Sequence, residues 1–152
     1  MKQADDDLLL EHQLCFALSV ASRSVVGAYK PVLEKLGLTH PQYLVMLALW
    51  EQSPRTVRSL GEALAMEPAT LSPMLKRLES AGFVSRNRSP QDDRSLAVDL
   101  TDAGRALRRD ATEVPGIMMG KLDLSREQVR ELNEAMRRLI SAAQAVPEQQ
   151  AG

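Results

Sequence analysis

Apolar residues recur at steps of three and four along most of the chain, the spacing that places them on one face of an α-helix. The longest such run predicts one long helix from Glu11 to Tyr29, because no proline interrupts it before Pro31. Thr39 suits the N-cap of a second helix and Pro41 suits its first turn. The N-terminal part of the chain is therefore predicted to be helical.

Two short helices are predicted next, over Val57–Leu64 and Ala69–Ser80. The second carries a complete i, i+3, i+4, i+7 apolar stripe, formed by Leu71, Met74, Leu75 and Leu78. The period then becomes alternating, which predicts strands over Phe83–Arg88 and Ser95–Leu100 joined by a polar turn at 89–94. Two helices, a tight turn and a β-hairpin make a winged helix-turn-helix, so the predicted fold class is mainly α with a small β-hairpin wing.

The C-terminal part returns to the helical period. Thr101 is expected to cap a helix that Pro115 and Gly116 interrupt or kink. Ser125 is expected to begin the last helix, and Gln128, three residues later, completes a capping box. A short tail after this helix, residues 147–152, is expected to be disordered.

The composition is that of a soluble globular domain, with 44% of the 152 residues hydrophobic and 26% charged. No apolar run approaches the roughly 18 residues that span a membrane, and the acidic start Met1–Asp7 lacks the apolar core of an export signal. The one cysteine, Cys15, fits a reducing cytoplasm and excludes cysteine-rich metal sites. Because there are also only two histidines, neither a metal nor another cofactor is expected.

The polar face of the predicted helix at 69–80 carries residue types that suit contact with DNA. Small hydroxyl groups near a helix N-terminus allow close approach to base edges and phosphates, and adjacent cations neutralise phosphates. The candidate contacts on this helix are Thr70, Ser72, Pro73, Lys76 and Arg77. A solvated helix face is the alternative interpretation of this pattern, and the adjoining wing favours DNA.

The net charge of −1 gives no hint of nucleic-acid binding until it is divided by segment. Residues 53–94 hold seven cations and five anions, a local charge of +2, which leaves −3 for the rest of the chain. Arg86 and Arg88 lie two apart on the first strand and so share one face. Arg94 at the wing tip suits a narrow minor groove, with Asp92 as its brace; alternatively, both are ordinary turn residues.

These motifs resemble the MarR family of dimeric winged-helix regulators. The resemblance rests on Leu75-Lys76-Arg77-Leu78-Glu79 followed by Gly82, on Asp92-Asp93-Arg94 and on Leu100-Thr101-Asp102-Ala103-Gly104. Further blocks resemble the OhrR branch, the organic-hydroperoxide-sensing repressors: Leu14-Cys15-Phe16-Ala17-Leu18, Tyr29-Lys30-Pro31, Pro41-Gln42-Tyr43-Leu44-Val45 and Val114-Pro115-Gly116. The resemblance implies a helical dimerisation region at 1–36 and 105–146, with a DNA-binding domain at 39–104.

Cys15 lies on the apolar stripe of the first helix, where a lone cysteine is ordinarily a buried small hydrophobe. The resemblance implies instead the reactive cysteine of the OhrR branch, which tyrosines of the other subunit hydrogen-bond. Tyr29 matches one of these, and Tyr43 lies in a matching block. Tyr29 is 14 residues from Cys15, about 21 Å along a straight helix, so it reaches the thiol only from the partner in an antiparallel two-fold pairing.

Two positions depart from the branch pattern. Ser19 stands where some members have tyrosine, and His40 stands where tyrosine is usual. An imidazole can replace a phenol as hydrogen-bond donor and, if protonated, stabilises a thiolate more strongly. A solvent-facing histidine at a helix start is the equal alternative. These departures bear on how strongly the surrounding side chains stabilise the thiolate of Cys15.

The resemblance implies a cytoplasmic homodimeric repressor, not an enzyme, that binds a pseudo-palindromic DNA operator and releases it when an organic hydroperoxide oxidises Cys15. Because there is no second cysteine, the sulfenic acid must react with a low-molecular-weight thiol, form a sulfenamide or overoxidise. One alternative is a regulator that responds to a small amphipathic or phenolic ligand, with Cys15 merely packed. The other, a thiol-dependent peroxidase, is disfavoured because the sequence supplies no resolving cysteine.

Overall fold

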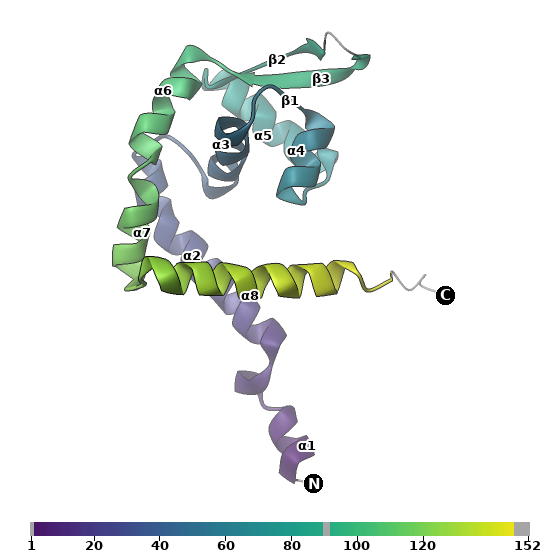
Figure 1. Ribbon diagram of the computed structural model, residues 1–152, viewed down its shortest axis with the longest axis vertical. Helices are drawn as coiled ribbons and strands as arrows, with labels where there is room; N and C mark the ends of the chain where they lie inside the picture. The colour runs from purple at the N-terminus through teal and green to yellow at the C-terminus, as the bar shows by residue number, and fades with distance from the viewer. Residues whose placement is uncertain (1, 90–91, 148–152) are drawn as a thin grey trace. The chain divides into compact units, whose positions relative to one another are not determined.

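The computed structural model describes residues 2–89 and 92–147 and is mainly helical, with one small antiparallel sheet (Figure 1). It divides into two compact units, Met1–Val114 and Pro115–Gly152. The predicted fold class, a winged helix-turn-helix with a small wing, is confirmed. No helix in the described ranges is long and apolar enough to cross a membrane.

The first unit begins with α1 (Lys2–Asp7), the 3-10 turn η1 (Leu10–His12) and the long helix α2 (Leu14–Glu34). The prediction was wrong at both ends of this long helix, which starts later than Glu11 and continues beyond Tyr29. Gln13 is extended, and its side-chain amide donates to the carbonyls of Asp7 (2.6 Å) and Leu9 (2.9 Å), which separates η1 from α2. Pro31 falls in the last turn of α2, where its missing N–H removes one bond near the helix end.

Helix α3 (His40–Glu51) is the central helix of the first unit. The predicted N-cap is confirmed: the Thr39 hydroxyl accepts from the Gln42 backbone N–H (3.3 Å), and the Gln42 side-chain oxygen accepts from the Thr39 N–H (3.0 Å). Five side chains of α3 are buried, namely Tyr43, Val45, Met46, Ala48 and Leu49. Because apolar residues occur all round this helix, it packs on more than one side.

The helix-turn-helix consists of α4 (Val57–Leu64) and α5 (Pro68–Ser80), close to the predicted bounds. The turn between them needs Ala65 in the left-handed region, at φ 53°. A Cβ at Gly61 would lie 2.7 Å from the Met66 carbonyl oxygen, so the turn closes tightly only over glycine. Leu71, Leu75 and Leu78 bury the predicted stripe of α5 and leave the opposite face in solvent.

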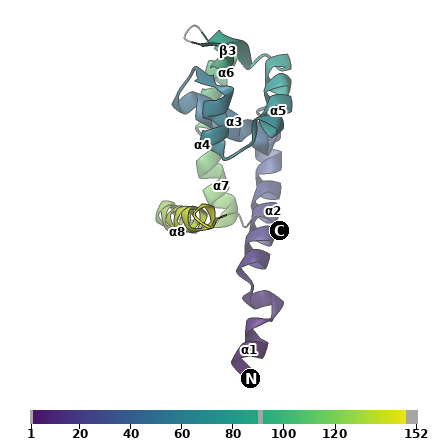
Figure 2. The same cartoon turned by 90° about the vertical axis from the view of Figure 1, so that its right-hand side faces the viewer.

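The wing is a three-stranded sheet in the order β1-β3-β2, formed by β1 (Arg55–Thr56), β2 (Val84–Ser89) and β3 (Asp92–Leu100). The two-residue strand β1 was not predicted. Strand β3 starts at Asp92, earlier than the predicted Ser95, because Asp92 pairs with Ser89 across the hairpin. Pro90 and Gln91, predicted within the turn, lie outside the described residues. Figure 2 gives a second view of the sheet with α3, α4 and α5.

Helix α6 (Asp102–Ala111) is joined to the winged domain at its first turn. Thr101 caps the helix as predicted, accepting from the Gly104 N–H (3.1 Å) and donating to the Gly82 carbonyl (2.6 Å). The Trp50 indole N–H of α3 donates to the Gly104 carbonyl (2.9 Å). A Cβ at Gly104 would overlap the carbonyl oxygen of Phe83, so only glycine allows this close approach.

The second unit contains α8 (Arg126–Gln144) and nearly all of α7 (Val114–Leu122). The helical interruption predicted at Pro115–Gly116 was misplaced: α6 ends at Ala111, and Pro115 is the second residue of α7. A proline fits the first turn of a helix, where the N–H groups have no helical partner, so it opens α7. The predicted capping box is confirmed, because Ser125 and Gln128 exchange hydrogen bonds of 3.1 and 2.9 Å.

The apolar stripe of the last helix is open to solvent in the single chain. Leu132 and Ile140 keep about half of their surface exposed, and Met136 keeps over a third. None of the residues of α8 is buried. A helix with this pattern gains its stability when the apolar face is covered, so the exposed stripe indicates an interaction surface. Residues 148–152, most of the tail predicted to be disordered, lie outside the described residues.

Candidate DNA-contacting face and thiol region

The exposed face of α5 gathers all of the candidate DNA contacts that were predicted on this helix. Thr70, Ser72, Pro73, Lys76 and Arg77 are all exposed, while the leucines of the same helix anchor it to the core. The Ser72 hydroxyl donates to the Pro68 carbonyl (3.0 Å), which occupies its proton and leaves its oxygen lone pairs facing outward as acceptors. The geometry therefore presents a polar, cationic helix face with no large apolar side chain.

Arg86 is placed differently from the other candidate contacts. Its backbone N–H donates to Glu79 Oε2 (3.1 Å), its Nε donates to the same oxygen (3.4 Å), and a terminal nitrogen donates to Oε1 (3.2 Å). Glu79 lies in the last turn of α5, so this pair links the helix to strand β2. The hydrogen bond from Arg86 lowers the pKa of the Glu79 carboxyl. Sequence reasoning missed Glu79 as a functional candidate.

The remaining wing candidates lie farther along the hairpin. Arg88 is exposed and lies two residues beyond Arg86 on the same face of β2, as predicted. Asp92 and Arg94 fall within strand β3, and their side chains are outside the described part of the structure. The proposed bracing of Arg94 by Asp92 therefore stays a prediction.

Two other cations of the predicted basic segment are already engaged within the protein. The Arg55 Nε donates to the carbonyls of Ala48 (3.1 Å) and Gln52 (3.0 Å), so this guanidinium closes the C-terminal end of α3. Arg58 forms an exposed i,i+4 pair with Glu62 on α4 (3.4 Å). The charge available for DNA is therefore concentrated on α5 and the wing.

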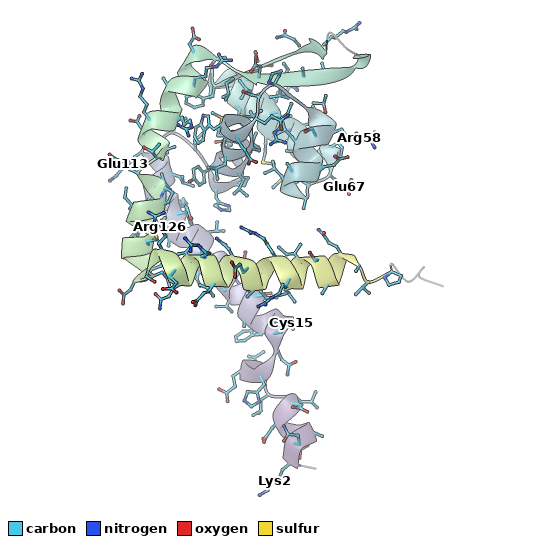
Figure 3. The ribbon with its side chains drawn as sticks, in the orientation of Figure 1. Lys2, Cys15, Arg58, Glu67, Glu113 and Arg126 are labelled. Atoms are coloured by element: carbon cyan, nitrogen blue, oxygen red, sulfur yellow. The ribbon has the colours of Figure 1, made fainter. Side chains whose placement is uncertain are left out.

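Cys15 is the second residue of α2 and is exposed in the single chain (Figure 3). Its neighbours Leu14 and Phe16 are exposed as well, and so is Ser19 one turn later. The ring of His12 does not serve the thiol here, since its Nδ1 lies 2.6 Å from the Asp6 carbonyl oxygen. Within one chain the structure thus leaves the thiol in an uncovered apolar stretch, and both the sensing cysteine and the packed cysteine stay predictions.

Tyr29, His40 and Tyr43 form one aromatic cluster between α2 and the start of α3. The rings of Tyr29 and His40 meet edge to face at 5.6 Å between centroids, and those of Tyr29 and Tyr43 lie 6.0 Å apart. Burial lowers the pKa of His40 and raises the pKa of Tyr29. For Tyr43, burial first and the nearby Tyr29 second raise the pKa. His40 is thus half-buried and favoured in its neutral form, not solvent-facing.

The structure separates this cluster from the cysteine within one chain. Cys15 and Tyr29 are both in the continuous helix α2, 14 residues apart, which corresponds to about 21 Å along the axis. The predicted supporting residues fall into two groups: Ser19 near the thiol, and Tyr29, His40 and Tyr43 near the other end of α2. A direct contact between the groups requires a second α2 helix running antiparallel.

Comparison with known proteins gives a consistent picture. Residues 28–110 match the family model described as transcriptional regulator SarA/Rot. The chain is 42% identical over 140 residues to the organic hydroperoxide resistance transcriptional regulator of Bacillus subtilis, covering 92% of this chain and 95% of that protein. It is similar to reduced AbfR bound to DNA (TM-score 0.75, 35% identity, 94% and 99% coverage) and to overoxidised AbfR bound to DNA (TM-score 0.75, 34% identity, the same coverage); AbfR is a protein of Staphylococcus epidermidis.

Proposed function

The chain belongs to the MarR/SarA family of winged helix-turn-helix transcriptional regulators, which are not enzymes, and we propose that it is a homodimeric repressor that senses organic hydroperoxides through Cys15. The observation that carries the proposal is the exposure of Cys15 in a chain similar, over nearly its whole length, to an organic hydroperoxide resistance regulator. Oxidation of this thiol would release operator DNA. The cytoplasm, with its DNA and its pool of small thiols, is the compartment in which we expect this chemistry.

The homodimer is supported by apolar surface that a single chain leaves uncovered. Leu8, Leu10 and Leu14 near the N-terminus each expose more than half of their surface, and so does Ile140 of α8. Surface of this kind marks a contact with another protein. An antiparallel pairing of two α2 helices would cover Cys15 and bring it to the Tyr29, His40 and Tyr43 cluster of the partner. We therefore assign 1–36 and 105–146 to dimerisation, and 39–104 to DNA.

In such a dimer the cluster would supply hydrogen-bond donors to the thiolate. A tyrosine is ordinarily protonated at neutral pH, and burial raises the pKa of both phenols further, so each keeps its O–H for donation. His40 is favoured in its neutral form and would donate through one ring N–H, without adding positive charge. The usual tyrosine of the branch is then replaced by a group of similar hydrogen-bonding ability.

The chemistry needs one sulfur atom and two outside reactants. The Cys15 thiolate attacks the distal oxygen of a hydroperoxide, the O–O bond breaks, and the alkoxide leaves as an alcohol after taking up a proton. The resulting sulfenic acid condenses with a low-molecular-weight thiol to give a mixed disulfide and water. The chain has no second cysteine. The final product is therefore a mixed disulfide with the external thiol, a sulfenamide or an overoxidised acid.

Release of DNA would follow from a change in the distance between the two α5 helices of the dimer. A two-fold dimer reads two half-sites about 34–36 Å apart, so its two α5 helices must keep that separation. A bulky adduct on Cys15 within the dimer interface would rotate the subunits and break this match. The candidate contacts on each half-site are Thr70, Ser72, Pro73, Lys76, Arg77, Arg86, Arg88, Asp92 and Arg94.

The test is a gel shift with wild type, Cys15→Ser and the matched control Ser24→Ala, an exposed serine on the opposite face of α2 from Cys15. The probe is a labelled duplex of about 30 base pairs, long enough for two half-sites, selected from a random library by the reduced wild-type protein. Cumene hydroperoxide with a small thiol should release wild type and Ser24→Ala but leave Cys15→Ser bound. Release of Cys15→Ser to the same extent would refute the sensor and favour a regulator that binds a small amphipathic or phenolic ligand.

A further inference from the structure

We propose that Glu79 and Arg86 form a clamp between the recognition helix and the wing, and that Glu79 strengthens DNA binding as a positioning residue without contacting DNA. Under this proposal Arg86, which the sequence suggested as a DNA contact, aligns the wing instead, whereas Lys76, Arg77 and Arg88 supply the phosphate contacts. The inference rests on the DNA-binding function of the protein and is independent of the chemistry of Cys15. It assigns a favourable role to a carboxylate on a surface that binds a polyanion.

The Glu79–Arg86 pair has more hydrogen bonds and is less exposed than an ordinary surface ion pair. Glu79 uses both carboxylate oxygens, and Arg86 uses its backbone N–H together with two guanidinium nitrogens. The Arg86 side chain is only 22% exposed and that of Glu79 is 41% exposed. By contrast, the Arg58–Glu62 pair on α4 is 89% and 72% exposed and has a single ionic contact of 3.4 Å. Planar two-nitrogen pairing adds direction as well as attraction.

The place of Arg86 on its strand explains why it turns toward the helix. Residues two apart on a strand share a face, and Val84, two residues earlier, is buried in the core. Arg86 pairs across the sheet with Val98, which is fully buried. The apolar stem of Arg86 therefore covers the edge of the core, and its guanidinium emerges beside the last turn of α5. Strand β2 packs against α5 at this level.

The clamp has two consequences for DNA binding. It fixes the direction in which β2 leaves α5, so the exposed Arg88 is presented in a constant relation to Lys76 and Arg77. It also neutralises a carboxylate that would otherwise stand on the recognition helix and repel phosphates. Loss of Arg86 removes both effects and leaves Glu79 unpaired. Loss of Glu79 removes only the alignment, and at the same time makes the reading face more positive.

This difference gives the test a clear sign. If Glu79 were a mere surface charge, Glu79→Gln would tighten DNA binding, since it removes one negative charge. The clamp predicts that Glu79→Gln weakens binding by about tenfold, the effect of losing one charge-assisted hydrogen-bonded contact. Glu62→Gln is the matched control, because it removes the same charge from an ion pair of the same domain and should leave binding unchanged or slightly tighter. Equal behaviour of Glu79→Gln and Glu62→Gln would overturn the proposal.

Salt dependence separates alignment by Arg86 from direct phosphate contact. Fluorescence anisotropy with the labelled duplex described above, on reduced protein at several salt concentrations, gives the slope of log affinity against log salt. Each phosphate contact adds about 0.9 to this slope. Arg88→Gln should lower the slope by about that amount per subunit, whereas Arg86→Gln and Glu79→Gln should keep it while lowering affinity. An Arg86→Gln slope reduced as far as that of Arg88→Gln would refute the clamp.

A third measurement needs no DNA and therefore stands apart from the proposed function. In the free protein, Glu79→Gln should speed amide hydrogen exchange in β2 by several-fold, with exchange in α3 unchanged. The double variant Glu79→Gln/Arg86→Gln should exchange the amides of β2 little faster than either single variant does, because both substitutions remove the same contact. Unchanged exchange in β2, or increases in exchange that add fully in the double variant, would show that the two residues act separately. If wild type failed to bind duplex DNA at all, the proposed function would fall, and the exchange result would still decide the clamp.

Discussion

The winged domain and helix α8 differ in how much of their apolar surface is buried within one chain. In the winged domain, leucines and valines from the helices and the sheet are fully buried, including Leu49, Leu60, Leu71 and Val98. In α8, none of the residues is buried, although its apolar stripe is as regular as that of α5. The contrast teaches that the first region buries its apolar face within one chain, whereas the second leaves its apolar face open, as the proposed dimer would need.

The largest loss of stability should come from Gly104→Ala, because it adds an atom where α6 and the winged domain approach most closely. The added Cβ would overlap the Phe83 carbonyl oxygen, and neither backbone segment can move far. We expect a loss of about 3 kcal/mol in the free energy of unfolding, measured by urea denaturation. Gly116→Ala on α7 is the control, since a Cβ there meets nothing within 4 Å, and it should be neutral or slightly stabilising. Equal stabilities of the two variants would contradict the close packing.

The next largest effect should come from Leu132→Glu, which places a charge on the open apolar stripe of α8. Leu132 is 50% exposed on α8, so a charge costs little in the single chain but must be desolvated in a covered interface. We expect the dimer dissociation constant to rise by about 100-fold in sedimentation experiments. Glu131→Gln, one residue away, is the control and should leave assembly unchanged. A dimer of unaltered strength would show that the stripe of α8 is not the interface.

A smaller effect is expected for Trp50→Phe, which removes one polar contact from the winged domain while keeping most of the packing. The indole N–H would no longer donate to the Gly104 carbonyl, and that oxygen would be left without this partner. The expected cost is about 1–2 kcal/mol by urea denaturation followed by circular dichroism. A loss below about 0.5 kcal/mol would mean that water replaces the indole at this carbonyl.

The smallest effect concerns His40, the first residue of α3, where the winged domain follows α2 along the chain. Burial lowers the pKa of His40 below its ordinary value near 6.5, so the unfolded chain takes up a proton more readily than the folded chain. The contribution of His40 to the free energy of unfolding is therefore fully present above about pH 6.5, and it is lost as the pH falls through the pKa of His40 in the folded protein. His40→Gln should flatten the fall in melting temperature between about pH 7 and 5. His12→Gln should retain that fall.

Local signals in the sequence predicted much of the fold. The N-cap at Thr39, the capping box at Ser125, the stripe of α5 and the hairpin all depend on residues within a few positions of one another. Strand β1 escaped prediction because two residues carry no alternation, and it exists only through pairing with β3. The carboxylate of Glu79 escaped for a related reason: its partner Arg86 comes close only after the chain has turned from helix to strand. Contacts of this kind follow from the fold and not from any local pattern.

The joint at Gly104 has a mechanical consequence. Trp50 holds the first turn of α6 from α3, while Thr101 ties it to Gly82 at the start of the hairpin. Glycine permits the close approach of the two backbones here, so the first turn of α6 is fixed both to α3 and to the start of the hairpin. If α6 moved relative to a partner subunit, α3 and the hairpin would therefore be expected to move with it as one body.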